Sequence, residues 1–182
     1  MAAIFSDYMH DLLNNLKATI DKLGARAFFN APAQMNDVTF LLERIPVSMP
    51  EKLKEFYLKY NGGFIADLRW TKAELLDIDN FKYIQWNSNH FFSLDMILSL
   101  FDDPDELINY ANEISPSEEK YLPFFRSQEQ EIYVIKVSSK NPNIPVYVLG
   151  RQTMPEDWSI VNNDFYDFLK AYVDTEGNIL TW

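Results

Sequence analysis

Two glycines follow an amphipathic run in KYNGG, Lys59 to Gly63, and such residues could hold a phosphate or end a helix. A phosphate-binding loop needs a strand, then the glycines, then a helix whose N-terminal N–H groups face the anion. Here apolar residues at helical spacing come first, and FIADLRW after the glycines has the composition of a strand. We therefore expect Asn61 and Gly62 to adopt the left-handed conformation that ends a helix, and we expect no phosphate site.

Metal-binding side chains are scarce in this sequence. It contains two histidines, His10 and His90, and no cysteine. Neither histidine has a second ligand three or four residues away on a clear helix, which is a typical spacing in zinc sites. The run from Asp77 to Asn80 resembles the start of a calcium loop, but Lys82 stands where that loop needs glycine and no glutamate closes it. We expect no metal and no cofactor.

Catalytic motifs are also missing. No serine lies in a G-x-S-x-G elbow, and the common glycine-rich nucleotide motifs do not occur. The run DDPDE, Asp102 to Glu106, could serve acid/base catalysis or bind a cation. Acids are equally typical of the first turn of a helix, where the helix dipole favours them. The sequence therefore favours a protein that is not an enzyme.

The charge distribution indicates a basic partner. The 182 residues have a net charge of −11. Residues 83–119 contain no lysine or arginine, yet their acidic residues are Asp95, Asp102, Asp103, Asp105, Glu106, Glu113, Glu118 and Glu119. Such a surface repels nucleic-acid phosphates and speeds encounter with a cationic protein. We therefore expect a basic protein partner and no direct nucleic-acid binding.

The composition is that of a globular chain, with 47% hydrophobic and 15% aromatic residues. No apolar run approaches the roughly 20 residues that a membrane-spanning helix requires. The start, MAAIFSDYMHDLLNNL, has no basic region before its apolar residues, so we expect no signal peptide. The lack of cysteine is compatible with the cytoplasm, which we take as the expected location.

The spacing of apolar residues predicts the elements of the first half. Apolar residues recur every three or four positions from Tyr8 to Leu23, which predicts a helix that ends at Gly24. We expect FFNAPAQMNDV to be a connection and TFLLERIPVS to contain a short helix. Ser48 and Glu51 have the form of a capping box, with Pro50 in the first turn of the next helix. The core-facing stripe of that helix comprises Leu53, Phe56, Tyr57 and Tyr60.

The second half mixes short strands and helices. FKYIQW and HFFSL read as strands, LDMILSLF as a helix, and DDPDELINYANEI as a helix capped by Asp103 with Pro104 at its first position. SPSEEKY repeats that capping pattern. EIYVIKV and IPVYVLG predict antiparallel neighbours, with the turn in SSKNPN. Asn163 is the expected cap of a last helix with one apolar side, formed by Phe165, Phe168, Leu169, Tyr172 and Val173. No repeat or linker occurs, so we predict a single α+β domain over residues 1–182.

The run SMPEKLKEFYLKYNGG resembles the signature of the SUKH superfamily, which includes yeast cell-wall assembly and glucan-synthesis regulators and many bacterial toxin-immunity proteins. The shared features are Met49-Pro50, Phe56-Tyr57 and Asn61-Gly62-Gly63. YLPFFRSQEQEIYVIKV, IPVYVLG and DFYDFLKAYV are similar to later family segments, so the resemblance covers most of residues 40–173. Residues 1–30 form an N-terminal helix and connection before it. The turn Ser127 to Gln130 departs from the family, because it lacks the glycines often found there.

This resemblance implies a mainly antiparallel β-sheet flanked by helices, in a non-catalytic protein that binds other proteins. Our leading hypothesis is an immunity protein that neutralises a partner toxin, such as a nuclease, through its acidic surface. We expect Trp86 to be an apolar anchor on that surface. The expected steering charges are Asp102, Asp103, Asp105, Glu106 and Glu113. For each of them, a solvated face that only aids solubility is the competing interpretation.

Two other functions stay open. By analogy with the eukaryotic members, the chain could be a regulatory scaffold for cell-wall or glucan synthesis. Alternatively, the aromatic residues from Trp86 to Phe92 could line a site for a small ligand. The sequence leaves the identity of the partner and the oligomeric state open.

Overall fold

The computed structural model describes residues 2–45, 48–66, 69–75, 77, 83–103, 106–115, 119–138, 144–149, 153 and 155–178. Within them, seven strands form one sheet in which each strand pairs antiparallel with the next along the chain. The strands are β1 (Ala27–Phe29), β2 (Gly63–Ile65), β3 (His90–Phe91), β4 (Glu119–Arg126), β5 (Ile132–Ser138), β6 (Val146–Val148) and β7 (Ile160–Asn162). The predicted α+β fold with an antiparallel sheet is confirmed.

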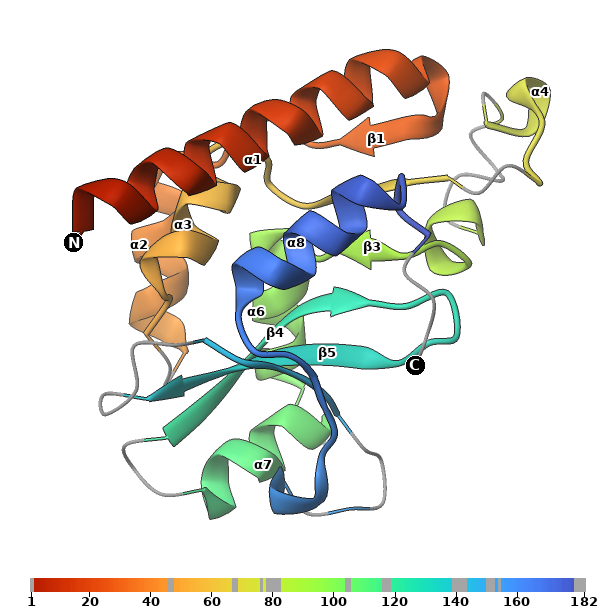
Figure 1. Ribbon diagram of the computed structural model, residues 1–182. Coiled ribbons are helices and arrows are strands. Elements are labelled where there is room, and N and C mark those ends of the chain that lie inside the picture. The colour runs from red at the N-terminus through yellow and green to blue at the C-terminus, as the bar shows by residue number, and fades with distance from the viewer. Residues whose placement is uncertain are drawn as a thin grey trace.

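Helices cover both faces of this sheet (Figure 1). They are α1 (Ala2–Leu23), α2 (Met35–Arg44), α3 (Glu51–Tyr57), α4 (Lys72–Leu75), α6 (Leu94–Asp102), α7 (Leu107–Ile114) and α8 (Phe165–Asp174), with short 3-10 turns η1 (Gly24–Arg26) and η2 (Pro155–Asp157). Strand β5 shows the two faces, because Tyr133 and Ile135 belong to the core under α8 whereas Val134 belongs to the core under α7. None of the helices in the described ranges is long and apolar enough to cross a membrane.

An aromatic core lies between the sheet and α8. The ring centroid of Phe168 is 5.0 Å from that of Phe125, 5.2 Å from Phe124 and 5.6 Å from Tyr133. Two of these three pairs are edge-to-face, the arrangement that aromatic quadrupoles favour. The predicted apolar side of α8 is confirmed, since Phe165, Phe168, Leu169, Tyr172 and Val173 are all buried.

The first helix packs against this core. Met9, Leu12, Leu13 and Leu16 of α1 are buried in the same cluster as the sheet and α8 residues. Tyr8, which the spacing placed on the core side, is exposed. The predicted end of the helix before Gly24 is confirmed, and Gly24 has a positive φ of 55°.

The turn at Asn61-Gly62-Gly63 joins α3 to β2, so the expected order of helix, turn and strand is confirmed. Gly62 has φ of 75°, and a Cβ there would lie 2.6 Å from the backbone carbonyl carbon of Phe92. Asn61 does not adopt the expected left-handed conformation. Its Oδ1 accepts a hydrogen bond from the N–H of Leu94 at 2.9 Å, so the turn is held by a side chain that reaches α6.

Three predicted caps are wrong in detail. The N-cap of α3 is Pro50, whose ψ of 147° is extended, so Ser48 forms no capping box. The N-cap of α7 is Glu106, and Asp103 instead ends α6 as its C-cap, while Pro104 lies outside the described residues. The N-cap of α8 is Asp164, one residue after Asn163, and its carboxylate accepts from the N–H of Tyr166 at 2.8 Å.

Other segments also differ from the predictions. The expected connection after residue 27 contains most of β1 and the start of α2. The expected strand FKYIQW is helical over residues 83–86, because Asn87 and Ser88 bond back to the carbonyl oxygens of Tyr83 and Ile84 and Ile84 is buried. Of SPSEEKY, Glu119 already begins β4, and residues 116–118 lie outside the described residues. Strands β3, β5 and β6 and the helix over LDMILSLF are confirmed, and the turn in SSKNPN lies mostly outside the described residues.

Candidate partner-binding surface

Five of the acidic residues of the middle segment lie on or at the ends of two consecutive helices, α6 and α7: Asp95, Asp102, Asp103, Glu106 and Glu113. Helix α6 begins because Ser93 accepts from the N–H of Met96 at 3.3 Å, and Asp95 stands in its first turn near the positive end of the dipole. Helix α7 turns Ile108 and Ala111 toward the sheet, so its remaining side faces solvent. The surface is therefore built from the outer sides of these two helices.

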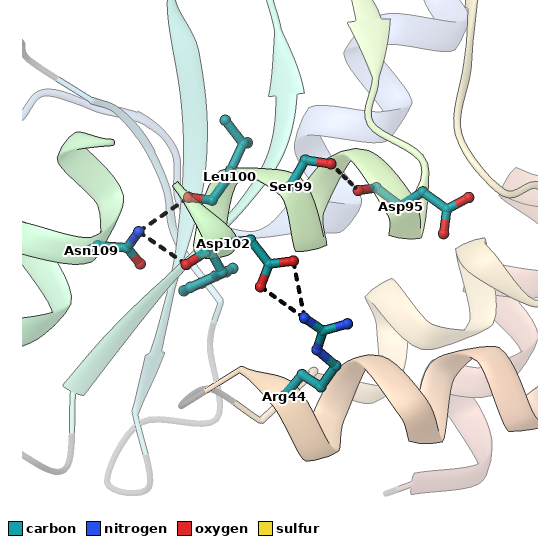
Figure 2. A network of polar contacts seen from close by, with 7 residues as sticks. Arg44, Asp95, Ser99, Leu100, Asp102 and Asn109 are labelled. Carbon is teal, nitrogen blue, oxygen red and sulfur yellow. Dashed lines mark hydrogen bonds and ion pairs between the residues drawn. The ribbon is translucent and has the colours of Figure 1, made fainter. Parts of the chain in front are cut away.

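One asparagine fixes the two helices against each other. The Nδ2 of Asn109 on α7 donates to the carbonyl oxygens of Leu100, Phe101 and Asp103 at 3.1, 3.2 and 2.7 Å. These carbonyls form the C-terminal end of α6, where backbone acceptors have no partner within the helix (Figure 2). The side chain of Asn109 thus caps α6 from the following helix and fixes α7 against the end of α6.

Asp102 is neutralised by a cation from a distant helix. One guanidinium nitrogen of Arg44, on α2, lies 3.0 Å from both carboxylate oxygens of Asp102 (Figure 2). The two side chains remain 44% and 53% exposed, so this pair adds at most about 1 kcal/mol to stability. Its larger effect is on the surface charge, because Asp102 no longer contributes a full negative charge to steering.

Glu106 and Glu113 lie at the two ends of α7. Glu106 is partly exposed as the N-cap, and its side chain makes no capping hydrogen bond. Glu113 is exposed in the last turn, which has no basic residue. A carboxylate at a helix C-terminus opposes the helix dipole, typically by about 0.3–1 kcal/mol. The helix dipole therefore does not explain the carboxylate at position 113.

Two exposed apolar residues accompany these acids. Tyr110 and Ile114 stand four positions apart on α7, so they lie one turn apart on the same side of the helix. Together with Glu106 and Glu113 they form a mixed acidic and apolar stripe on α7. Asp103 is exposed beside the stripe, and Asp105 lies outside the described residues.

Trp86, the expected anchor, is not brought to this stripe. Its side chain is 48% exposed, and the guanidinium of Arg126 on β4 lies over its ring, 4.2 Å from the centroid. Its carbonyl oxygen accepts a hydrogen bond from Gln130 in the turn between β4 and β5. The contacts of Trp86 therefore join it to the β4–β5 hairpin instead of to α6 and α7.

The histidines do not form a metal site with neighbouring acids. His10 is exposed, whereas His90 is buried and its Nδ1 lies 3.2 Å from the carbonyl oxygen of Ser88. Burial lowers the pKa of His90 to about 4, so the ring is neutral at physiological pH. In the part of the chain that the structure describes, no three His, Cys, Asp or Glu residues are close enough to hold a metal ion.

The expected structural residues lie at the two ends of one segment. Pro50 begins α3 and Asn61, Gly62 and Gly63 end the turn that follows it. A Cβ on Gly63 would lie 2.4 Å from the carbonyl oxygen of Phe28 on β1, which leaves room for glycine alone. These residues position α3 against the first strands and present no free group to a partner.

A groove beside α7 contains further residues that the sequence reasoning missed. It holds a volume of about 430 Å³ and is lined by parts of α7, β4, β5, β6, η2 and β7. Its residues extend from position 114 to position 160, so no local spacing could have identified them.

A comparison with protein-family models matches residues 32–171 to the SMI1 / KNR4 family (SUKH-1). The matched region runs from the connection before α2 into α8, and α1 precedes it. A search of curated proteins found no match.

Proposed function

This chain belongs to the SMI1 / KNR4 family (SUKH-1), and we propose that it is a non-catalytic binding protein that neutralises a basic toxin, such as a nuclease, by covering the toxin's active site. The observation that supports this proposal most is the mixed stripe on α7. Glu113 stands where the helix dipole disfavours a carboxylate, beside the exposed Tyr110 and Ile114. Exposed apolar side chains that alternate with carboxylates on one side of a helix are typical of a surface that meets a basic partner.

The charge of the stripe supports a cationic partner. A nuclease presents basic residues to phosphates, so an acidic protein competes with the nucleic acid for that surface. Asp102 contributes least, because Arg44 pairs with it, whereas Glu106 and Glu113 keep their charges exposed on α7.

The first test is affinity capture. The tagged full chain is used as bait in lysate of its own source organism at low and high salt, and the retained proteins are identified by mass spectrometry. We expect one basic toxin-like or nuclease protein whose retention weakens with salt. Recovery of envelope-synthesis proteins would move the assignment to a regulatory scaffold, and retention of no basic protein at either salt would reject neutralisation.

The second test measures association with the purified partner by stopped flow. The double variant Glu106→Gln with Glu113→Gln should slow association about threefold to tenfold at low salt and flatten its salt dependence. The matched control removes two exposed acids from other helices, Asp11→Asn with Asp167→Asn, and should leave the rate within about twofold of the wild type. If the two double variants slow association equally, the association rate depends only on the net charge of the chain and the stripe on α7 is not the steering surface.

A further inference from the structure

The groove beside α7 is formed by one face of four successive strands and the two elements that flank it. Antiparallel register places Tyr121 of β4 beside Lys136 of β5, and Tyr147 of β6 beside Ile160 of β7. Ile114 of α7 lines the same hollow, as does Trp158, which follows η2. Figure 1 shows η2 next to α7 below the sheet. We name this hollow, with its volume of about 430 Å³, the α7–β7 groove.

Three aromatic rings surround the groove. The ring centroids of Tyr121 and Trp158 are 5.0 Å apart with their planes at 64°, and those of Tyr121 and Tyr147 are 6.2 Å apart at 87°. Tyr121 and Trp158 are buried and pack edge-to-face on each other, whereas Tyr147 is partly exposed to the groove. Aromatic faces attract cations, and a guanidinium can also stack on them.

The charged groups of the groove leave an excess of negative charge. The Nζ of Lys136 lies 2.6 Å from a carboxylate oxygen of Glu119, and both side chains are about one-third exposed or less. Glu156 also lines the groove and is exposed. Among the described residues that line the groove, two carboxylates therefore stand against one ammonium group, which favours a guest cation over an anion.

The rim of the groove is apolar. Ile114 is 39% exposed on α7 and Ile160 is 57% exposed on β7, and both line the hollow. Exposed isoleucines beside a concave aromatic surface are typical of a place where another chain excludes water. The α7 stripe continues directly to this rim, because Ile114 belongs to the stripe and also lines the groove.

We propose that the α7–β7 groove receives an arginine side chain from the basic partner, a conclusion that rests on the proposed function. The guanidinium lies on the ring of Tyr147, with Tyr121 and Trp158 buried behind it, and donates to the carboxylate of Glu156, while the partner's backbone crosses between Ile114 and Ile160. Arginine fits this arrangement better than lysine, because its planar group both stacks on rings and donates two parallel hydrogen bonds.

The groove is tested with a peptide and its uncharged isostere. The probe is the blocked tripeptide Gly-Arg-Gly, and the control is the same peptide with citrulline, which keeps the shape of arginine without its charge. Both are titrated into the ¹⁵N-labelled full chain, and the indole N–H signals of Trp158 and Trp86 are followed by NMR. We expect the arginine peptide to shift the Trp158 signal in a saturable way, while the Trp86 signal stays in place. The citrulline peptide should bind with an affinity at least fivefold lower.

Two variants check the assignment. Glu156→Gln, on an exposed side chain, and Tyr147→Leu should each weaken the arginine titration at least fivefold, whereas Asp11→Asn on α1 should leave it unchanged. A dispersed amide spectrum without peptide, with the Trp86 indole signal in place, shows that each variant is folded. Equal shifts of Trp158 and Trp86, or equal binding of citrulline, would overturn the arginine site.

The captured partner separates this inference from the proposed function. Loss of at least tenfold affinity for that partner in Glu156→Gln supports the groove as the docking site. Unchanged affinity in both groove variants would reject the groove while neutralisation by the chain stands. If the arginine peptide binds at Trp158 but no basic partner is recovered, the groove is supported and the proposed function fails.

Discussion

At the scale of single residues, the same charge has different consequences at different places. Asp102 and Glu113 are both carboxylates near the C-terminal end of a helix, where the dipole disfavours them. Arg44 offsets this for Asp102, with both carboxylate oxygens 3.0 Å from one guanidinium nitrogen. The last turn of α7 contains no basic residue, and Lys120 of β4, which reaches this turn, donates to the carbonyl oxygen of Asn112.

This contrast predicts opposite changes in stability. Glu113→Gln should raise the free energy of unfolding by about 0.3–1 kcal/mol, because it removes an unfavourable charge–dipole interaction. Asp102→Asn should leave it unchanged or lower it by up to about 1 kcal/mol, since the exposed Arg44 pair is lost. Urea unfolding of both variants at low salt measures the difference, and a destabilised Glu113→Gln would show that Glu113 has a structural role.

The buried histidine predicts a loss of stability in mild acid. The unfolded chain binds a proton at His90 near pH 6.5, whereas burial keeps the folded pKa at about 4. Between these values the unfolded state binds more protons, so the free energy of unfolding falls as the pH falls. From pH 7 to pH 5, His90 should account for a loss of about 2 kcal/mol.

Urea unfolding at the two pH values checks this for His90→Gln and for His10→Gln. His90→Gln should lose about 2 kcal/mol less of its free energy of unfolding than the wild type between pH 7 and pH 5. His10→Gln should lose as much as the wild type, because His10 is exposed. A wild-type loss that persists in full in His90→Gln would assign it to other groups.

At the scale of elements, close backbone contacts and helix caps set how the pieces meet. In the turn after α3, the backbone of Gly62 lies so close to Phe92 that a Cβ would be 2.6 Å from the carbonyl carbon of Phe92. The Oδ1 of Asn61 accepts a hydrogen bond from the N–H of Leu94, the first residue of α6. Asn109 then caps the far end of α6 from α7. These contacts fix both ends of α6, and Asn109 joins α7 to α6. The mixed stripe on α7 therefore keeps its orientation.

Two glycines with positive φ form a matched pair for testing the turn. Gly24→Ala should cost about 1 kcal/mol, because nothing lies within 4 Å of its Cβ and only the left-handed strain remains. Gly62→Ala should lower the free energy of unfolding by at least about 2 kcal/mol. The same left-handed strain applies there, and the new Cβ would also lie 2.6 Å from the Phe92 backbone, which must shift. Thermal unfolding of the two variants would disprove the role of the turn if their losses are equal.

At the scale of the whole molecule, the packing extends beyond the region that the family shares. The family match begins at residue 32, but Met9, Leu12, Leu13 and Leu16 of α1 are buried in the main core. Helix α1 also packs against α3 and α8, the helices that cover the sheet. The N-terminal helix thus belongs to the body that presents α7 on the opposite face.

Substitution of one core residue of α1 tests this packing. Leu16 is fully buried, so Leu16→Ala should lower the free energy of unfolding by about 2–5 kcal/mol through lost contacts and a cavity. The exposed neighbour Asn15→Ala should change it by less than about 0.5 kcal/mol. Urea unfolding followed by circular dichroism compares the two, and similar small changes would mean that α1 is dispensable for the core.

The sequence by itself determined the elements whose signals are local. The apolar sides of α1 and α8, strands β3, β5 and β6, and the helix–turn–strand order around Gly62 depend on residues within a few positions of each other. The same local signals misplaced the caps at Ser48, Asp103 and Asn163, because neighbouring polar residues compete for the cap and only packing selects among them.

Only the tertiary structure decided which side chains meet. Arg44 pairs with Asp102 across 58 positions, Arg126 covers Trp86, and the α7–β7 groove gathers residues from four strands and α7. Such contacts depend on strand register and on the angle of helices to the sheet, which no pattern within one segment contains. The sequence therefore identified an acidic segment, and the fold placed Glu106 and Glu113 beside the exposed Tyr110 and Ile114 on α7, the surface that we propose meets a partner.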